Sequence, residues 1–497
     1  MLAHRIGAAA DRPRVSVRAR PRLPYGATRA VAASCSLAGV TSRPLTPRPA
    51  ATTAVRASPG TEAVPPVTPN NPRRPPIPGA GREGRNTIET LLFRGISTPV
   101  AFALVVIQSR FLDPEGRGRF VLVVLTVSIL ARLLGQLGVA VTSLAGEGEL
   151  RPLSARALAW TLLLGLGSAG VILLAGVTIN AFGLRLAAIA APALVPNILN
   201  ACLSGILLGR ARVRLWNVIQ ILPPLLTLAG MLLVVVGLDG GVDAAVGVWT
   251  IAYVLTAVVA LIAARDLWLP LTRVRIFDRL GRAIARLALA MGFVQIVNLI
   301  GYRVELFVLE HFKGLGQVGI YSIAMQAAEA IWLIPAAVAS AVTGPVVHED
   351  EEGAARQIRN ACGKGLLYTM AVAVAIGIAA PFVIPVVFGD EFRGAVRPLV
   401  LLLPGVVAYA PVTILVVYLT VRRARPRLSL YVSLIGLIVT AGMSVVLIPP
   451  YGASGAAVAS AIGYAAGGLA AWLFFIRLSS RRGGETALSP SLTDARV

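Results

Sequence analysis

The sequence predicts an all-α membrane protein with twelve transmembrane helices in two six-helix lobes related by a pseudo-twofold axis. Three observations support this prediction: an apolar composition, a series of long apolar runs, and internal matches between the two halves of the chain. The 497 residues are 56% hydrophobic and only 14% charged. Soluble domains carry about 25% charged residues, so the composition indicates a polytopic membrane protein.

The apolar runs define the predicted helices. Each run is about 20 residues long, which allows a helix to cross the ~30 Å hydrocarbon core of a bilayer. Charged residues and turn residues separate the runs. They lie at 91–111, 119–144, 155–178, 185–209, 215–238, 243–264, 286–309, 318–346, 365–388, 395–420, 428–449 and 453–476.

The positive charges between the runs predict the orientation. Loops that follow even-numbered runs carry 18 Lys and Arg, whereas loops that follow odd-numbered runs carry seven. Because cytoplasmic loops are enriched in these residues, we expect both termini on the cytoplasmic side of the cell membrane. The net charge of +23 lies in these loops and in residues 1–86, with no basic and aromatic strip, so nucleic-acid binding is not predicted.

Internal matches indicate a parallel repeat. The polar stretch FLDPEGRGRF, residues 111–120, is echoed by FKGLGQVGIY, residues 312–321, at an offset of 201. A second match, at an offset of 212, relates residues 240–246 to residues 452–458. The pairs of the first match are Phe111 with Phe312, Gly118 with Gly319 and Phe120 with Tyr321. Two copies in the same orientation predict an axis along the membrane normal and a central cavity between the lobes.

These patterns divide the chain into five parts. Residues 1–86 contain 14 arginines and many prolines without helical periodicity, which predicts a disordered cytoplasmic tail; an organellar transit peptide, an over-extended gene start and a lipid-attracted basic tail are the alternatives. The lobes are predicted at 87–264 and 286–478. Residues 265–285 form a cytoplasmic linker that is expected to lie amphipathically on the membrane, and 479–497 form a second cytoplasmic tail.

Charged residues inside the apolar runs are candidate site residues, because such a charge costs ~2.5–3.5 kcal/mol at mid-membrane. Arg132 lies near the middle of its run, with Ser128 and Gln136 on the same helical face. It is either a phosphate contact or a buried packing partner for a carboxylate. Arg94 lies in the first turns of its run, where it either contacts phosphate or extends to the cytoplasmic surface.

Polar residues in the second half form a further candidate group. The run 286–309 carries a polar stripe at helical spacing that is expected to face the cavity: Gln295, Asn298, Tyr302 and Glu305. On a continuous helix Arg303 points away from Glu305, so no pairing of these two is predicted. Glu329 lies near the middle of run 318–346. Glu305 and Glu329 are the predicted ion or proton carriers, with a structural ion pair as the alternative for Glu329.

Metal and nucleotide chemistry is not predicted. Cys35, Cys202 and Cys362 stand far apart without a histidine cluster, so we expect neither a disulfide framework nor a bound metal or other cofactor. The sequence has no G-x-x-x-x-G-K-[ST] motif, so the chain is not itself an ATPase.

Four stretches resemble the polysaccharide transporter family, which includes O-antigen and other lipid-linked oligosaccharide flippases of the MOP exporter superfamily. They are RFLDPEGRGRF, VGIYSIAMQAAEAIWLIPAAV, FGDEFRGAVRPLVLLLPG and IPPYGASGAAVASAIGY. The resemblance covers residues 88–478. It implies a V-shaped, two-lobed transporter that turns a polyprenyl-diphosphate-linked glycan across the cytoplasmic membrane. The chain departs from its relatives at Glu305, where they often have Asp.

The resemblance also suggests roles for the candidate residues. In a transporter that works by alternating access, Arg94, Arg132 and Arg303 would bind the lipid diphosphate through charge-assisted hydrogen bonds, beside the polar residues Gln295, Asn298 and Tyr302. The expected partners are the lipid-linked glycan, the bilayer, a polysaccharide polymerase and glycosyltransferases.

Two other functions remain open. An ion-coupled multidrug exporter of the same superfamily would use carboxylates for a cationic substrate. A membrane glycosyltransferase or polymerase would use acidic residues of an outside loop, as Asp113 and Glu115 stand in the first one. The outside loops are short, which disfavours an enzyme that must hold an acceptor.

Overall fold

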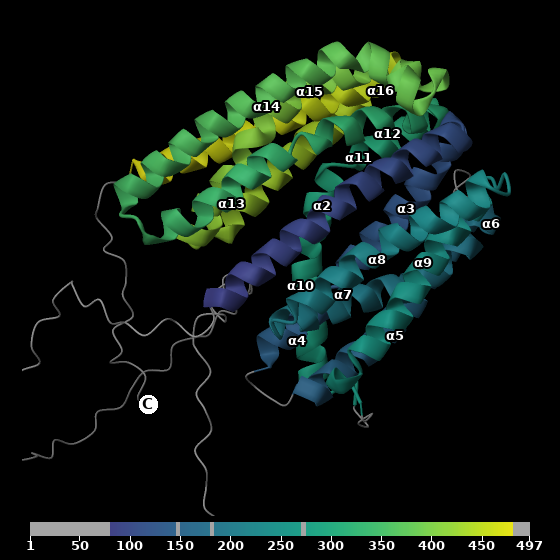
Figure 1. Ribbon diagram of the computed structural model, residues 1–497, viewed down its shortest axis with the longest axis vertical. Coiled ribbons are helices and arrows are strands. Elements are labelled where there is room, and N and C mark those ends of the chain that lie inside the picture. The colour runs from purple at the N-terminus through teal and green to yellow at the C-terminus, as the bar shows by residue number, and fades with distance from the viewer. Residues whose placement is uncertain (1–79, 146–149, 179–182, 270–274, 481–497) are drawn as a thin grey trace, which may run out of the picture.

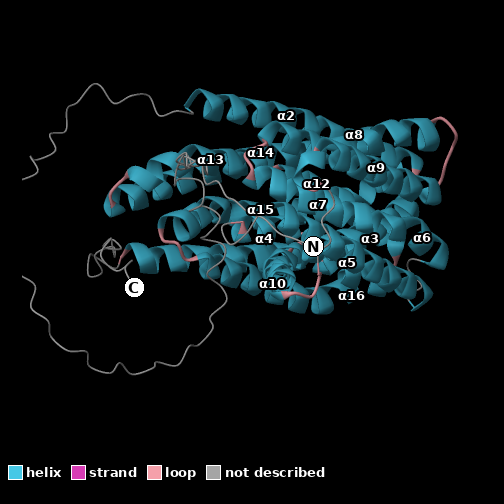
Figure 2. Cartoon of the chain, turned by 90° about the horizontal axis from the view of Figure 1, so that it is seen from below, coloured by secondary structure: helices cyan, strands magenta, loops and turns pink. Residues whose placement is uncertain are grey.

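The computed structural model describes residues 80–145, 150–178, 183–269 and 275–480. Every regular element in these ranges is a helix, as Figures 1 and 2 show. The all-α prediction is therefore confirmed for the part of the chain that the structure describes.

The first half of the described chain folds into eight α-helices with short 3₁₀ and π segments. The helices are α2 (Ala80–Phe111), α3 (Pro114–Leu134), α4 (Leu137–Leu144), α5 (Leu150–Thr178), α6 (Gly183–Ala190), α7 (Leu194–Gly209), α8 (Val213–Met231) and α9 (Val242–Ala263). A 3₁₀ turn, Ala191–Ala193, joins α6 to α7, and a π segment, Leu232–Val236, extends α8. Since α2 begins at Ala80, residues 80–86 are helical and not disordered as predicted; residues 1–79 lie outside the described residues.

The second half of the described chain folds into seven α-helices. Its α-helices are α10 (Arg279–Gly301), α11 (Val304–Lys313), α12 (Leu315–Ala330), α13 (Leu333–His348), α14 (Glu351–Phe388), α15 (Val396–Val416) and α16 (Pro426–Ser479). Short segments lie at Arg265–Leu267, Asp390–Ala395 and Val417–Arg422. The second predicted tail, beyond residue 480, lies outside the described residues.

Ten helical stretches of the described chain are long and apolar enough to cross a membrane. The apolar part of α2, Gly95–Phe111, is shorter, and α16 covers the last two predicted runs. Within α16 the helical conformation is interrupted at Gly452, where φ is 57° and ψ is −133°. Many large apolar side chains on these helices are exposed, for example Leu166 at 66% and Phe382 at 75%. Such surfaces suit a lipid environment.

Besides run 185–209, which the 3₁₀ turn at Ala191–Ala193 divides, three of the predicted continuous helices are interrupted. The breaks fall at Gly135–Gln136 between α3 and α4, at Tyr302–Arg303 between α10 and α11, and at Ile331–Trp332 between α12 and α13. Pro335 accounts for the third break, because a proline ring clashes with the carbonyl four residues earlier and lacks the N–H that would bond to it. The breaks turn side chains that a continuous helix would place on one face.

The inter-lobe linker is shorter than predicted. α10 begins at Arg279 and not at 286, because Asp278 caps the helix by accepting a hydrogen bond from the Gly281 N–H at 2.7 Å. Asp278 also forms an ion pair with Arg156 of α5 at 2.5 Å. Ile284 and Ala288 on α10 pack in a core cluster made of first-half residues. The first turns of α10 are therefore anchored to the first half of the chain, while residues 270–274 lie outside the described residues.

The two halves meet most closely where α3 crosses α12. A Cβ atom added at Gly118 would lie 2.0 Å from the Leu315 carbonyl oxygen, and one added at Gly319 would lie 1.9 Å from the Pro114 carbonyl oxygen. The offset of 201 relates Gly118 to Gly319 and Pro114 to Leu315. The crossing is thus the same contact made twice with the partners exchanged.

Figure 1 shows the arrangement around this crossing. Helices α13, α14, α15 and α16 lie on one side, and α4, α5, α7, α8 and α9 lie on the other. The two groups meet near α3 and α12 and diverge away from them. One large core cluster belongs almost entirely to the second half, with Leu122 and Leu125 of α3 inserted into it.

Candidate functional site

An ion pair joins two of the helix breaks. Arg303 lies at the break between α10 and α11, and Glu329 lies on α12 just before the break at Ile331–Trp332. The guanidinium donates to both carboxylate oxygens of Glu329, with Nη1–Oε1 at 2.5 Å and Nη2–Oε2 at 2.8 Å. The side chains retain 21% and 17% exposure. A candidate cation for substrate and a candidate ion carrier therefore neutralise each other in this conformation.

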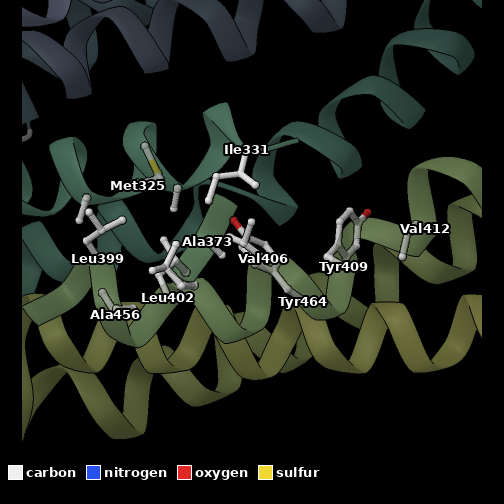
Figure 3. Close-up of a cluster of buried hydrophobic side chains, with 14 of the residues drawn as sticks. Met325, Ile331, Ala373, Leu399, Leu402, Val406, Tyr409, Val412, Ala456 and Tyr464 are labelled. Atoms are coloured by element: carbon white, nitrogen blue, oxygen red, sulfur yellow. The ribbon is translucent and has the colours of Figure 1, made fainter. Parts of the chain in front are cut away.

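Four aromatic rings pack beside this ion pair. The rings belong to Tyr302 at the end of α10, Trp332 at the break between α12 and α13, Tyr409 on α15 and Tyr464 on α16. Every ring contacts the other three, with centroid distances from 5.3 to 5.9 Å. The hydroxyls of Tyr302 and Tyr409 lie 2.5 Å apart, and the Trp332 indole N–H donates to the Val406 carbonyl at 3.3 Å. Figure 3 shows Tyr409 and Tyr464 within the core beside α15.

Glu305 lies in the protein interior and not on a cavity wall. Its side chain is fully buried, and Oε1 accepts a hydrogen bond from the Tyr321 hydroxyl at 3.3 Å. Tyr321 also lies 3.1 Å from the Ser460 hydroxyl on α16. The second carboxylate oxygen, Oε2, has no hydrogen-bond partner among the described residues. The predicted cavity-facing stripe is wrong at this residue, because the break at Tyr302–Arg303 turns α11 relative to α10.

The other members of the stripe stay on α10 or at its end. Gln295, Asn298 and Tyr302 are half-buried. Asn298 and Tyr302 line a pocket of about 340 Å³ between α10, α15 and α16. The structure thus brings Asn298 and Tyr302 together at one pocket, with Arg303 directly behind Tyr302, whereas Gln295 does not line it.

Arg132 lies apart from this group. It occupies the last turn of α3, shortly before the break at Gly135–Gln136, and its side chain is exposed. No carboxylate among the described residues pairs with it, so the interpretation as a buried packing partner is wrong. The Arg94 backbone lies in α2, but its side chain is outside the described part of the structure. No contact of Arg94 can therefore be assigned.

Arg117 is a residue that the sequence reading missed. It counted among the arginines of an outside loop, yet it lies in the first turn of α3 and is fully buried. Its guanidinium donates to Ser322 Oγ on α12 at 2.9 Å, to the Val105 carbonyl at 3.1 Å and to Gln108 Oε1 at 3.3 Å. The signal was available: Asp113 followed by Pro114 is a helix N-terminal pattern, which places Arg117 inside the helix.

The described ranges contain no group of side chains that could bind a metal ion. No three His, Cys, Asp or Glu side chains there gather closely enough to hold an ion. Cys202 and Cys362, which are both buried, are unpaired.

Comparisons with known proteins give one family match and several structural matches. A family model described as "Polysaccharide biosynthesis protein" matches residues 84–351. Comparison with curated protein sequences finds no significant match. Among solved structures, the chain is similar to the lipid II flippase MurJ in an inward closed conformation, with 13% identity, a TM-score of 0.66, and coverage of 79% of this chain and 90% of that one.

Two further structures share the fold. An inward-facing multidrug resistance MATE family transporter of the MOP superfamily is 18% identical, with a TM-score of 0.64 and coverage of 77% of this chain and 94% of that one. A MOP superfamily transporter from Pyrococcus furiosus, described as having a binding pocket of reverse polarity, is 17% identical, with a TM-score of 0.54 and coverage of 80% and 95%. At these identities the likeness concerns the fold, which is that of a multi-pass membrane protein.

Proposed function

The chain belongs to the polysaccharide biosynthesis protein family, whose model matches residues 84–351, and from this premise we propose that it is a flippase for a polyprenyl-diphosphate-linked oligosaccharide. It would move this lipid across the cytoplasmic membrane by alternating access and so supply cell-surface polysaccharide synthesis. The family match is the observation that supports this proposal most strongly. The MOP-type fold is consistent with it, since transporters with very different substrates share that fold.

The proposed architecture has twelve spans in two lobes. α2 crosses once, and α16 crosses twice with its turn at Gly452. The N-terminal lobe covers 87–264 and the C-terminal lobe 286–478, with α10 bridging from one to the other through its anchor at Asp278. With both termini cytoplasmic, the α3–α12 crossing lies at the outer surface. The diverging ends of the lobes then face the cytoplasm, where the lipid-linked glycan is made.

Arg132 is the proposed contact for the diphosphate. Its side chain is exposed and no carboxylate neutralises it among the described residues, so its charge is available to an anion. A guanidinium can grip a phosphate through two parallel hydrogen bonds, which replace part of the hydration that the diphosphate loses. Arg94, on α2, is a second candidate for the same role.

Arg303 and Glu329 form the proposed coupling element. In this conformation the Arg303 guanidinium donates two hydrogen bonds to Glu329 and is therefore not available to a substrate. A proton or Na⁺ that binds Glu329 would release Arg303, so ion binding would change the affinity of this site for an anionic substrate. Such differential binding is what a gradient needs to drive a conformational cycle. Glu305, buried with one oxygen unpaired, is a second proton or ion carrier in this proposal.

Complementation tests the proposed function. A bacterial strain that lacks its polysaccharide flippase accumulates the lipid-linked glycan inside and shows no surface glycan. We expect the full chain to restore surface glycan and to abolish the internal pool. A chain that reaches the membrane, leaves the pool unchanged and instead lowers sensitivity to cationic drugs would be a multidrug exporter.

A further inference from the structure

The pocket of about 340 Å³ between α10, α15 and α16 has an unusual lining. Its volume falls within the ~300–1,000 Å³ typical of small-molecule sites, which are mostly apolar with a few polar groups. Here six of the nine lining side chains carry a hydroxyl or an amide, and none carries a charge. The six are Asn298, Tyr302, Tyr409, Thr413, Ser429 and Ser433.

The lining suits a sugar ring better than other parts of a lipid-linked glycan. Hydroxyl and amide groups both donate and accept hydrogen bonds, as sugar hydroxyls do. Tyr302 and Tyr409 are held by each other and by Trp332, so they offer rigid rings with an apolar face and a polar tip. Without a cation in its wall, the pocket gives a diphosphate nothing to replace its lost hydration.

A lipid tail fits the same wall poorly. A hydrocarbon chain in the pocket would displace water from the amide of Asn298 and the hydroxyls of Thr413 and Ser429, and it offers these groups no hydrogen bond in return. Each buried polar group that loses its partner is penalised, whereas a sugar hydroxyl can satisfy it. The three valines of the wall, Val412, Val416 and Val432, are a minority.

We propose that this pocket binds a neutral sugar unit of the glycan while Arg132 holds the diphosphate. The inference rests on the proposed function and deepens it, because it assigns the glycan to the C-terminal half and the phosphates to α3. Specificity for the sugar would then depend on Thr413, Ser429 and Ser433, which none of the sequence patterns singled out.

Photo-crosslinking in cells that make a lipid-linked glycan tests this assignment. A benzophenone amino acid is placed at Thr413 in the pocket, at Ser128 one turn from Arg132, and at Val400, a control position that is exposed on α15. Mild acid then cleaves the bond between glycan and diphosphate. The adduct at Thr413 should keep the glycan after acid, and the Val400 position should yield no glycan adduct.

Three outcomes are distinguishable. Glycan retained at Thr413, and reduced by about tenfold when Ser429 and Ser433 are both changed to Ala, supports the pocket assignment, since two ordinary hydrogen bonds are lost. A second outcome is a substrate adduct at Ser128 with no glycan adduct at Thr413, where only lipid or nothing is crosslinked. This outcome overturns the pocket assignment but does not contradict the proposed flippase function. No substrate adduct at either position contradicts the proposed function itself.

A second observation, independent of the pocket, concerns Arg117. The guanidinium is fully buried at the α3–α12 crossing, and its three acceptors are neutral. Its Nη2 has no partner, and no carboxylate among the described residues pairs with it. The repeat offset of 201 relates Arg117 to Val318, which is also fully buried. One side of a symmetric contact thus holds a charge where the other holds a valine.

We expect this charge to destabilise the crossing. Burying a cation without a counter-charge costs several kcal/mol even after the protein relaxes. Two of the three acceptors keep another partner without Arg117: Ser322 Oγ also donates to the Gly319 carbonyl at 2.7 Å, and the Val105 carbonyl also accepts from Ser109 Oγ at 2.7 Å. Gln108 Oε1 has Arg117 as its donor. Separation of α3 from α12 would return the guanidinium to water.

We infer that Arg117 sets the balance between the closed and the open state of the α3–α12 crossing. Its burial in the closed state is opposed by its hydration in the open state, so the closed contact stays reversible despite the tight packing at Gly118 and Gly319. Arg117 is a positioning residue in this account, since it acts through the crossing and not through contact with substrate.

Thiol labelling of the full chain tests this role. In a background with Cys35, Cys202 and Cys362 replaced by Ser, Leu122→Cys places a thiol that is buried at 1% exposure on α3. A membrane-impermeant maleimide should label it only when the crossing opens. Arg117→Met should slow labelling at least tenfold and raise the melting temperature, Arg117→Lys should label at nearly the unmodified rate, and the surface control Arg119→Met should change neither.

The opposite result would overturn the inference. If Arg117 only holds the contact closed through its hydrogen bonds, Arg117→Met will label faster and melt at a lower temperature. Equal labelling of Arg117→Met and the unmodified chain would likewise show that the buried charge does not influence the crossing.

Discussion

Arg303 and Glu329 form a two-point ion pair that spans two helix breaks, although they are 26 residues apart in sequence. The pair fixes the end of α10 against the end of α12. It also removes one of three proposed substrate cations from use until the pair opens. In the proposed mechanism, ion binding at Glu329 would therefore be linked to substrate binding at Arg303 without a separate relay.

Removal of one partner tests the pair. Breaking a fully buried ion pair this way costs roughly 3–5 kcal/mol, and we expect less for Glu329→Gln because the two side chains retain 21% and 17% exposure. The melting temperature in detergent should fall for Glu329→Gln and recover in Arg303→Met/Glu329→Leu, which removes both charges. If the double variant melts as low as the single one, the ion pair is not the source of the loss.

Close packing at the repeat crossing yields a second prediction. Gly118→Ala and Gly319→Ala each place a methyl group within 2.0 Å of a carbonyl oxygen, and such overpacking costs about 1–3 kcal/mol. Gly316→Ala is the matched control on α12, because nothing lies within 4 Å of its added Cβ. Thermal unfolding should show a clear loss for the first two variants and none for the control. Equal behaviour of all three would mean that the helices do not cross so closely.

A third prediction concerns pH and the anchor of α10. The Arg156 guanidinium, and secondly the Gly281 N–H, hold the pKa of Asp278 below its usual value of about 3.9. A lowered pKa stabilises the folded protein above the unfolded value, and this stabilisation disappears as pH falls through the folded value. Asp278→Asn keeps a capping side chain but loses the charge. It should be less stable than the unmodified chain at pH 7, and the difference should begin to shrink as pH falls below about 4, the unfolded value, and disappear only below the lower folded value.

Detergent melting curves between pH 3 and pH 7 check this prediction. Arg156→Gln serves as the partner variant and should show the same convergence at low pH. A stability difference that persists unchanged to pH 3 would assign the effect of Asp278 to capping alone.

Orientation is testable by reporter fusions. The loop charges predict cytoplasmic positions after Arg212 and Arg425, and an outside position after Asp390. Fusions to a phosphatase that works only outside and to a fluorescent protein that folds only inside should give opposite signals at these sites. An outside signal after Arg425 would contradict the proposed twelve-span topology.

The sequence predicted the helices better than the contacts between them. Apolar run length locates α5, α9 and the end of α14, which begins at Glu351 and not at 365. The glycine echo identified Gly118 and Gly319, whose lack of a Cβ the crossing requires. The breaks were missed, although Pro335 signals the one at Ile331–Trp332. That omission had consequences at the site, because periodicity on a continuous helix cannot place Arg303 against Glu329.

Burial of polar groups was the other source of error. Arg117 was assigned to a loop because charged residues separate the predicted apolar runs, and Glu305 to a cavity wall because of its helical spacing in a polar stripe. Both are fully buried, and only the packing of α3, α11 and α12 determines this. Arg132 is the opposite case. It lies in an apolar run, yet in the last turn of α3 its side chain is exposed and has no carboxylate partner among the described residues.

Transport in proteoliposomes tests most directly whether the chain is an arginine-assisted flippase that moves a lipid diphosphate. Lipid-linked glycan in the inner leaflet is protected from membrane-impermeant periodate, so its loss over time measures flipping. We expect rapid loss with the unmodified chain, slower loss with Arg132→Lys, which keeps the charge without the planar fork, and the protein-free rate with Arg132→Ala. Arg119→Ala, with matched incorporation, should behave as the unmodified chain. If Arg132→Ala flips the glycan as fast as the unmodified chain, the account is wrong at its central residue.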